Sequence, residues 1–318
     1  MSNETAILEP SPQGISRAAT ILQAGGLVAF PTETVYGLGG DARNGLAVAR
    51  IYEAKGRPAF NPLIVHVPDL ETAREYAIVS QAAEALASAF WPGPLTLVLP
   101  QVTGSGLSPL VTAGQSSVAI RVPAHPVAVA LLRAFGGPLA APSANPSGRI
   151  SATRAAHVMD GLSGRIDAVI DGGACAVGVE STIVGMVDQP QLLRPGGVTV
   201  EALDAVLGHA LTSGGSAEAP TSPGQLLSHY APRAGVRLDV LAPKPGEVWV
   251  GFGPGCVGAD LTLSQSGDLL EAAANLFHIL RAADAIAGAV GIAFAPIPET
   301  GLGRAINDRL RRAAAPRS

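Results

Sequence analysis

Short apolar segments alternate with longer helix-like segments along most of the chain, and this alternation limits the possible folds more than any other feature of the sequence. Strand-like segments lie at 27–30, 63–67, 95–99, 118–122, 139–141, 168–170 and 182–187, with helix-like segments such as 81–90 and 127–135 between them. Alternating strands and helices predict an α/β fold. Several strands lie too close together for a helical crossover, so we expect a mixed sheet with antiparallel members.

The composition also suggests how the chain is divided. Residues 1–12 are expected to be a flexible tail, and residues 13–207 an α/β domain. The segment 208–232 is rich in Gly, Ser, Ala and Pro and has almost no charge, which is typical of a linker. Residues 233–318 contain a further strand–helix pattern and are expected to form a second, smaller α/β domain.

Charge and cysteine content narrow the class of protein. The formal net charge of −4 argues against non-specific binding to nucleic acid, which needs a broad basic face. The two cysteines, Cys175 and Cys256, are isolated and fit a reducing compartment. No apolar run approaches the length that spans a bilayer, and the N-terminus shows no signal-peptide pattern. We therefore expect a cytoplasmic protein with no membrane association.

Lysine is rare, which draws attention to the lysine at position 55. The chain has two lysines and nineteen arginines, and Lys55 stands two positions before Arg57 in a segment marked by Gly and Pro. Both side chains could point at one phosphate group. A solvated basic loop is the alternative, and for an isolated Lys-x-Arg it would be the better interpretation.

Polar side chains gather where apolar strands end. The set comprises Thr34 after one strand, His66 and Arg121 at the ends of two others, Ser143 and Asn145 between prolines, Ser181 beside Glu180, and Arg194 leaving an apolar segment. Ligands of α/β sheets bind at such strand ends. Turn capping could explain the Thr and Ser residues singly. Together, the cations and hydroxyls predict a concave site for a polyanionic small molecule, most simply a nucleotide.

One apparent nucleotide motif is not convincing. The loop at 37–42 formally matches the dinucleotide-binding pattern GxGxxA, but six residues separate it from the preceding strand. The dinucleotide fold requires a direct tight turn at this point. No P-loop, HExxH or GxSxG motif is present.

Taken in order, the motifs resemble those of the YrdC-like threonylcarbamoyl-AMP synthases. The matching segments are FPTETVYGLG (30–39), KGRP (55–58), NPLIVH (61–66), WPGPLT (91–96), AIRVP (119–123), APSANPSG (141–148), VESTIV (179–184) and LRPGG (193–197). Later segments, from Ser222 to Pro232 and from Gly301 to Leu310, resemble the long, two-domain form. The resemblance implies a YrdC-like twisted mixed sheet with helices around a concave basic site, followed by a small Rossmann-like C-terminal α/β domain.

The resemblance also implies an activity. Members of this family combine L-threonine, bicarbonate and ATP into threonylcarbamoyl-adenylate and pyrophosphate with Mg²⁺. A separate transferase then passes the threonylcarbamoyl group to adenosine 37 of tRNA. We therefore expect ATP, L-threonine and bicarbonate as ligands, hand-over to such a transferase, and no stable direct binding of tRNA. The residues that would bind Mg²⁺ cannot be named from the sequence.

Motif by motif, the resemblance assigns residues to the two substrates. It places eight residues and the linker tyrosine around ATP: Lys55, Arg57, Asn61, Ser117, Ser143, Asn145, Ser151, Arg194 and Tyr230. It places five around L-threonine: Thr34, His66, Arg121, the backbone of Ala141 and Ser181. Lys55 and Arg57 are the expected catalytic pair, and Arg121 is the expected clamp for the substrate carboxylate.

The linker departs from the family pattern. The family linker carries two basic residues where the segment 224–230 reads GQLLSHY, so a phosphate contact from this segment is in doubt, whereas a covering role is not. An alternative function is a module that binds double-stranded RNA or tRNA on the same concave surface, although the acidic balance opposes it. A carbamoyl-phosphate-dependent transferase domain is a further alternative, but such enzymes carry additional regions that do not occur in this sequence.

Overall fold

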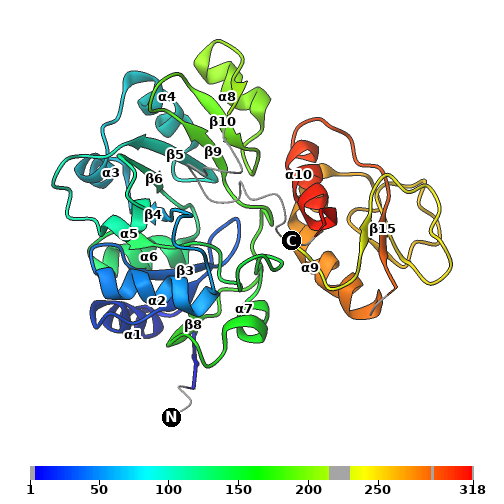
Figure 1. Cartoon of the computed structure of the whole chain (residues 1–318), viewed down its shortest axis with the longest axis horizontal. Helices are drawn as coiled ribbons and strands as arrows, with labels where there is room; N and C mark the ends of the chain where they lie inside the picture. Colours follow the sequence, from blue (N-terminus) through cyan, green and yellow to red (C-terminus); the bar gives the residue numbers. More distant parts are fainter. Residues whose placement is uncertain (1–3, 215–229, 288–289, 317–318) are drawn as a thin grey trace.

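The computed structural model describes residues 4–214, 230–287 and 290–316, and within them the strands form two separate sheets (Figure 1). The larger sheet belongs to the N-terminal part of the chain, up to residue 214. The smaller sheet belongs to the C-terminal part, from residue 230 onward. Parallel and antiparallel pairs both occur in the larger sheet, which confirms the prediction of a mixed α/β fold.

The larger sheet has eleven described strands. From one edge to the other they are β1 (Ala6–Leu8), β8 (Ala168–Ile170), β2 (Val28–Phe30), β3 (Gly37–Asp41), β7 (Leu139–Ala140), β4 (Ile64–His66), β6 (Ser117–Arg121), β5 (Leu95–Pro100), β9 (Thr182–Gly185), β10 (Gln191–Arg194) and β11 (Thr212–Ser213). Strands β4 and β6 are parallel, and their register places His66 beside Arg121.

Helices connect these strands, and most begin after a residue whose side chain caps the first turn. They are α1 (Pro12–Gln23), α2 (Gly45–Lys55), α3 (Leu70–Tyr76), α4 (Gln81–Phe90), α5 (Pro109–Thr112), α6 (Pro126–Phe135), α7 (Ala155–Leu162) and α8 (Val200–Leu207). The Asn44 side chain caps α2, and Gly56, with φ of 60°, ends it. Lys55 therefore lies in the last turn, directly before a left-handed residue that glycine adopts at little cost.

The glycine-rich segment after Phe30 is a strand, whereas we had expected a loop. Residues Gly37–Asp41 form β3, which pairs antiparallel with β2. Glycine is depleted in strands, which is why the pattern did not predict one here. Close packing explains the residue type, because a Cβ at Gly39 would lie 2.8 Å from the Phe30 ring.

The expected N-terminal tail is also wrong in part. Residues Ala6–Leu8 form the edge strand β1, parallel to β8, and Thr5 donates a hydrogen bond of 2.8 Å to the carbonyl of Ile166. Leu8 is buried in an apolar cluster with Leu22 of α1. The short apolar run 6–8 was the available signal, but it is shorter than a typical strand.

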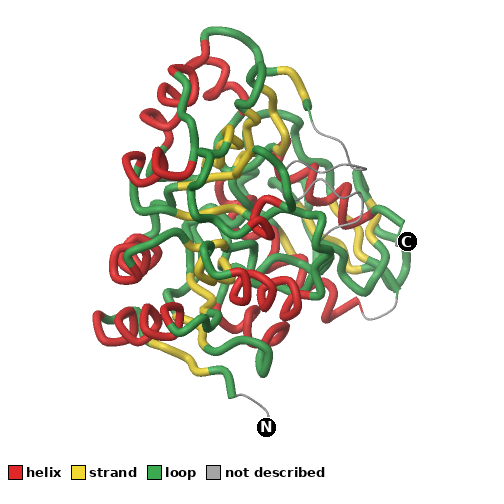
Figure 2. The backbone as a smooth tube through the Cα atoms, turned by 60° about the vertical axis from the view of Figure 1, so that its left-hand side comes forward, coloured by secondary structure: helices red, strands yellow, loops and turns green. Residues whose placement is uncertain are grey.

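The C-terminal part has a four-stranded described sheet in the order β12 (Val236–Arg237), β15 (Ile292–Phe294), β13 (Val248–Gly251) and β14 (Leu261–Thr262), with every pair parallel. Helices α9 (Leu269–Ala287) and α10 (Gly303–Ala314) lie on the side of this sheet that faces the N-terminal part (Figure 1). Figure 2 shows the backbone of both parts turned by 60°. One apolar cluster contains residues of both, including Val35 and Val179 with Phe277 and Ile306.

None of the described helices is long and apolar enough to cross a membrane. The expected linker, 208–232, is described only at its two ends, since residues 215–229 lie outside the described residues. The domain boundaries at 207/208 and 232/233 therefore stay predictions.

Removing the Leu8 side chain tests the role of β1. Leu8 is 4% exposed and its neighbour Ile7 is 62% exposed. We expect Leu8→Ala to lower the free energy of unfolding by about 2–4 kcal/mol, because it leaves a cavity in a packed cluster. The matched variant Ile7→Ala should change it by less than about 0.5 kcal/mol. Equal urea-denaturation midpoints for the two variants would show that β1 adds no stability.

Two buried histidines predict a loss of stability in mild acid. Burial and the charge of Arg121 lower the pKa of His66 to about 3, and burial lowers that of His157 to about 4. The unfolded chain therefore takes up these protons first, at a pKa near 6.5, so their contribution is complete above about pH 6.5 and is lost as the pH falls toward 4.

At pH 5 each histidine should cost roughly 2 kcal/mol relative to pH 7.5. Urea unfolding at the two pH values measures this difference, which His66→Gln should reduce. His209→Gln is the control because this residue is exposed. A difference that His66→Gln leaves unchanged would contradict the assignment.

Candidate functional site

A cleft lies where several strands of the larger sheet end, and it collects most of the polar residues that the sequence singled out. Its lining consists of Thr32, Val35, Gly37, Arg57, Ile64, His66, Arg121, Ala141, Pro142, Ser143, Glu180, Ser181, Arg194 and Tyr230. Eight of these were predicted as site residues. Their segments are far apart in sequence and meet because β2, β4, β6, β7, β9 and β10 belong to one sheet.

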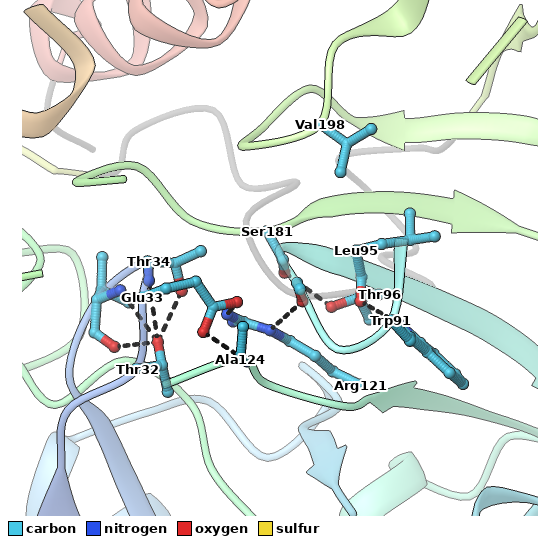
Figure 3. A network of polar contacts seen from close by, with 12 residues as sticks. Thr32, Glu33, Thr34, Trp91, Leu95, Thr96, Arg121, Ala124, Ser181 and Val198 are labelled. Atoms are coloured by element: carbon cyan, nitrogen blue, oxygen red, sulfur yellow. Dashed lines mark hydrogen bonds and ion pairs between the residues drawn. The ribbon is translucent and has the colours of Figure 1, made fainter. Parts of the chain in front are cut away.

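Arg121 and Glu33 form an ion pair at one end of the cleft (Figure 3). The Arg121 Nη2 donates to Glu33 Oε1 at 2.5 Å, and the Ala124 N–H donates to Glu33 Oε2 at 3.0 Å. Burial would raise the pKa of Glu33, but the charge of Arg121 and these hydrogen bonds lower it, so the carboxylate is ionised. An incoming carboxylate would therefore share Arg121 with Glu33.

Thr32 lines the cleft, whereas Thr34, the residue predicted from the sequence, lies behind it. The two hydroxyls are 2.8 Å apart, and Thr32 Oγ1 also donates to the carbonyl of Val35 at 2.6 Å (Figure 3). The alternative of a capped turn is thus correct for Thr32. Thr34 supports that turn, and a direct contact from it to a ligand stays a prediction.

Ser181 is held in a fixed position from two sides. Its hydroxyl lies 2.7 Å from that of Thr96 (Figure 3). On the other side, Arg194 Nη2 donates to it at 3.2 Å. Arg194 also donates to the Ser181 carbonyl from Nε and Nη2, at 3.2 and 2.9 Å. A hydroxyl held in this way presents a defined polar contact to whatever enters the cleft.

Arg57 and Lys55 are both buried next to backbone carbonyls. Arg57 donates from Nε to Asn61 O at 3.1 Å and from Nη2 to Pro62 O at 2.9 Å, and burial lowers its pKa to about 10. The Lys55 ammonium donates to the carbonyls of Ser143 and Asn145. Burial and the charge of Arg57 lower the pKa of Lys55 well below its ordinary value.

Lys55 is not itself among the residues that line the cleft. It fixes the loop that carries Ser143, and two of the three N–H groups of its ammonium are used for this purpose. The third N–H has no hydrogen-bond partner among the described residues.

Three buried polar atoms at the site have no hydrogen-bond partner among the described residues. They are Asn61 Oδ1, Asn145 Oδ1 and His66 Nδ1. Such groups normally carry a penalty unless water or a ligand satisfies them. The His66 ring is neutral, because burial lowers its pKa to about 3, so it can accept or donate without adding charge.

The remaining predicted residues lie around the cleft. Ser151 does not line the cleft, but it donates a hydrogen bond of 2.5 Å to Oε1 of Glu180, which does. The Ala141 N–H donates to the Ile64 carbonyl, so only the Ala141 carbonyl is left for a ligand. Tyr230, the first described residue after 215–229, is buried within the cleft lining.

Ser117 does not line this cleft. It begins β6, four residues before Arg121, and lines a second concavity with Val98, Gly185 and Leu193. Four residues of extended strand span roughly 13 Å. Because strand side chains alternate, Ser117 and Arg121 still lie on the same face of the sheet. Contact with a long ligand along that face stays a prediction.

Glu180 lines the cleft, although it is not among the site residues predicted from the sequence. Burial would raise its pKa, but Arg309, Arg194 and the Ser151 hydroxyl lower it to about 2. Arg309 belongs to α10 in the C-terminal part, and its Nε lies 2.8 Å from Glu180 Oε2. The available signal was a carboxylate within the apolar segment 179–184. Its partner, 129 residues away, could not be identified from the sequence.

No metal site made of protein side chains is found in the described part of the chain, where no three His, Cys, Asp or Glu residues gather closely enough. The two carboxylates at the cleft, Glu33 and Glu180, are each engaged by an arginine.

Family models match nearly the whole chain. The Sua5/YciO/YrdC model, described as telomere recombination, matches residues 20–196, and the threonylcarbamoyl-AMP synthase C-terminal domain model matches residues 198–315. The second model starts before the predicted linker and includes α8.

Curated relatives are similar over the same extent. A threonylcarbamoyl-AMP synthase of Bacillus subtilis is 44% identical, covering 94% of this chain and 92% of its own length. One of Pyrococcus abyssi is 42% identical, with 93% of each chain covered. Among solved structures, the P. abyssi Sua5 protein in complex with L-threonine matches with a TM-score of 0.90 and 40% identity, covering 98% of both chains. The chain therefore belongs to the Sua5/YrdC family of threonylcarbamoyl-AMP synthases, in its two-domain form.

Proposed function

We propose that this chain joins L-threonine, bicarbonate and ATP into threonylcarbamoyl-AMP and releases pyrophosphate, for the modification of adenosine 37 in tRNA. The observation that carries the proposal is an excess of buried positive charge at the cleft. Lys55, Arg57 and Arg121 are each at most 9% exposed. Buried cations are costly unless an anion compensates them.

The carboxylates at the cleft do not balance these cations. Glu33 is paired with Arg121, and Glu180 already has Arg309 from the C-terminal part. Arg57 instead contacts neutral carbonyls, as does the Lys55 ammonium. A ligand with several negative charges, such as ATP, fits this imbalance.

The threonine end of the cleft is assigned to Arg121, His66, Ser181 and the Ala141 carbonyl. Register pairs His66 with Arg121, so a carboxylate on the guanidinium would lie beside a neutral imidazole. Thr32 joins this group because its hydroxyl lines the cleft and is fixed by the turn. A relative of 40% identity has been solved in complex with L-threonine, which supports this assignment.

The nucleotide end is assigned to Arg57, Ser143, Arg194 and Tyr230, which line the cleft. The buried oxygens of Asn61 and Asn145 stand behind them and have no partner among the described residues. Lys55 supports this end by fixing the Ser143 loop. Lys55 and Arg57 remain our assignment for neutralising phosphate charge in the transition state.

The reaction needs no protein nucleophile. Bicarbonate and the threonine amine form a carbamate, with loss of water. A carbamate oxygen then attacks the α-phosphorus of ATP, and the bond to the β-phosphate oxygen breaks to release pyrophosphate. The protein must hold the reactants in line and compensate charge, which fixed arginines in a partly dry cleft can do.

Mg²⁺ would accompany ATP. Magnesium in phosphate-transfer sites is usually held by phosphate oxygens, water and few carboxylates. This suits a cleft whose carboxylates, Glu33 and Glu180, are engaged by arginines. The product would pass to a separate transferase that acts on tRNA.

Pyrophosphate release tests the proposed reaction directly. We expect the purified chain to release pyrophosphate from Mg²⁺–ATP only when L-threonine and bicarbonate are both present. Release without threonine would contradict the proposal. A tRNA titration at moderate salt separates the RNA-binding alternative, which requires tight binding of tRNA in the absence of nucleotide.

Arg121 and Arg57 should separate the two substrates. We expect Arg121→Gln to raise the KM for threonine more than tenfold and the KM for ATP less than threefold. The reason is that the threonine carboxylate loses its charged partner in the cleft, at a cost of about 2–5 kcal/mol. Arg57→Gln should show the opposite preference.

Steady-state kinetics with each substrate varied in turn measure both effects. Arg50→Gln is the matched control, since Arg50 pairs with Asp167 at 2.9 Å and does not line the cleft. Equal losses for both substrates in Arg121→Gln would mean that Arg121 is structural.

A further inference from the structure

Arg309 is a charged residue of the C-terminal part that is completely enclosed. It is 1% exposed and heads the fully buried side chains of the described residues in volume. Its Nε lies 2.8 Å from Glu180 Oε2 in the N-terminal part, and its Nη1 lies 2.6 Å from Asp308. The Arg309 Nη2 atom is buried without a partner among the described residues. Burying a guanidinium in this way is costly, so its position calls for an explanation.

Two groups that Arg309 contacts line the proposed substrate cleft. Glu180 is one, and it accepts the hydrogen bond from Ser151 on its other oxygen. Tyr230 is the second: the Arg309 guanidinium lies 5.5 Å from its ring centroid, and Phe277 of α9 stacks on the same ring at 5.3 Å. Arg309 therefore contacts two side chains that line the cleft, Glu180 and Tyr230, without lining the cleft itself.

The backbone of Tyr230 shows that its position is imposed by these surroundings. Its φ is 61°, in the left-handed region that a bulky residue rarely adopts. Such a conformation persists only where contacts over-determine it. The contacts that hold this segment include Arg309, Phe277 and the hydrogen bond from Ala231 N–H to the Gly148 carbonyl, at 2.9 Å.

Simple docking of the two parts does not need a buried charge pair. Apolar packing already joins them, and Gly178 approaches α9 so closely that a Cβ would lie 2.3 Å from the Ala273 carbonyl. A second ion pair, Arg304–Glu201, crosses the interface at 3.2 Å with both side chains exposed. Replacing a buried ion pair by apolar groups is often neutral for stability.

We propose that Arg309 is a positioning residue for the nucleotide, so that the C-terminal part completes the active site instead of only stabilising the fold. By neutralising Glu180, Arg309 keeps that carboxylate from drawing Arg194 away from phosphate, and it holds Tyr230 in the cleft wall. This inference rests on the proposed function for the identity of the ligand, ATP. The threonine end, at Arg121 and His66, has no contact with Arg309 and should be affected much less.

Binding measured without turnover tests this inference separately from the reaction. Calorimetry on the full chain would give the dissociation constants of Mg²⁺–ATP and of L-threonine for Arg309→Met. We expect ATP affinity to fall at least tenfold and threonine affinity to change less than threefold. Arg304→Met, which removes the exposed interface pair on the same helix, should leave both unchanged. Wild-type chain that binds ATP but releases no threonine-dependent pyrophosphate would count against the proposed reaction alone.

Two further variants keep the test decisive if Arg309→Met folds poorly. Arg309→Lys keeps the positive charge but loses the planar guanidinium with its several N–H donors, so it should bind ATP with intermediate affinity. In Glu180→Gln/Arg309→Met no unpaired carboxylate remains, so we expect it to recover part of the ATP affinity lost in the single variant. The inference is overturned if Arg309→Met keeps its ATP affinity, or if both substrate affinities and the unfolding midpoint fall together without recovery in the double variant.

Discussion

The pairing of buried arginines with anions is the interaction on which the arrangement of this molecule depends. Arg121 lies at the end of a central strand and has Glu33, from the turn between β2 and β3, as its partner. Arg309 reaches Glu180 from the other sheet-containing part of the chain. Each pair joins segments that are remote in sequence, and in each pair one member, Arg121 or Glu180, lines the cleft. A site for a polyanion is thus assembled from charges that are already held by the fold.

The mixed sheet supplies the positions at which these charges can meet. Parallel pairing of β4 with β6 places His66 beside Arg121, and parallel pairing of β5 with β9 brings Thr96 near Ser181. The antiparallel hairpin of β2 and β3 presents the turn that contains Thr32. The same arrangement explains why the polar residues follow strands: a strand interior is needed for packing, and its end is free to meet a ligand.

Much of this arrangement could be predicted from the sequence, because the apolar patterns of the helices and strands agree with the order of the motifs. Helix α4 and strand β8 occur at the predicted residues, and most other elements end within a few residues of the prediction. Motif order identified the family and most of the cleft lining. Which of Thr32 and Thr34 faces the cleft could not be predicted, because side-chain direction in a turn depends on its closing hydrogen bonds. Strand β3 was missed because its glycines are selected by packing against Phe30, a contact that is invisible in a local pattern. The role of Arg309 was missed because it depends on a residue in another part of the chain.

The central claim is that one cleft binds threonine through Arg121 and the phosphates of ATP through Arg57 and Arg194. A crystal structure of the full chain with L-threonine and a non-hydrolysable ATP analogue would test it. The account predicts the threonine carboxylate on Arg121 beside His66, the phosphates between Arg57 and Arg194, and Tyr230 against the nucleotide with the Glu180–Arg309 pair intact. A nucleotide bound outside this cleft, or a threonine carboxylate without Arg121 as its partner, would contradict it.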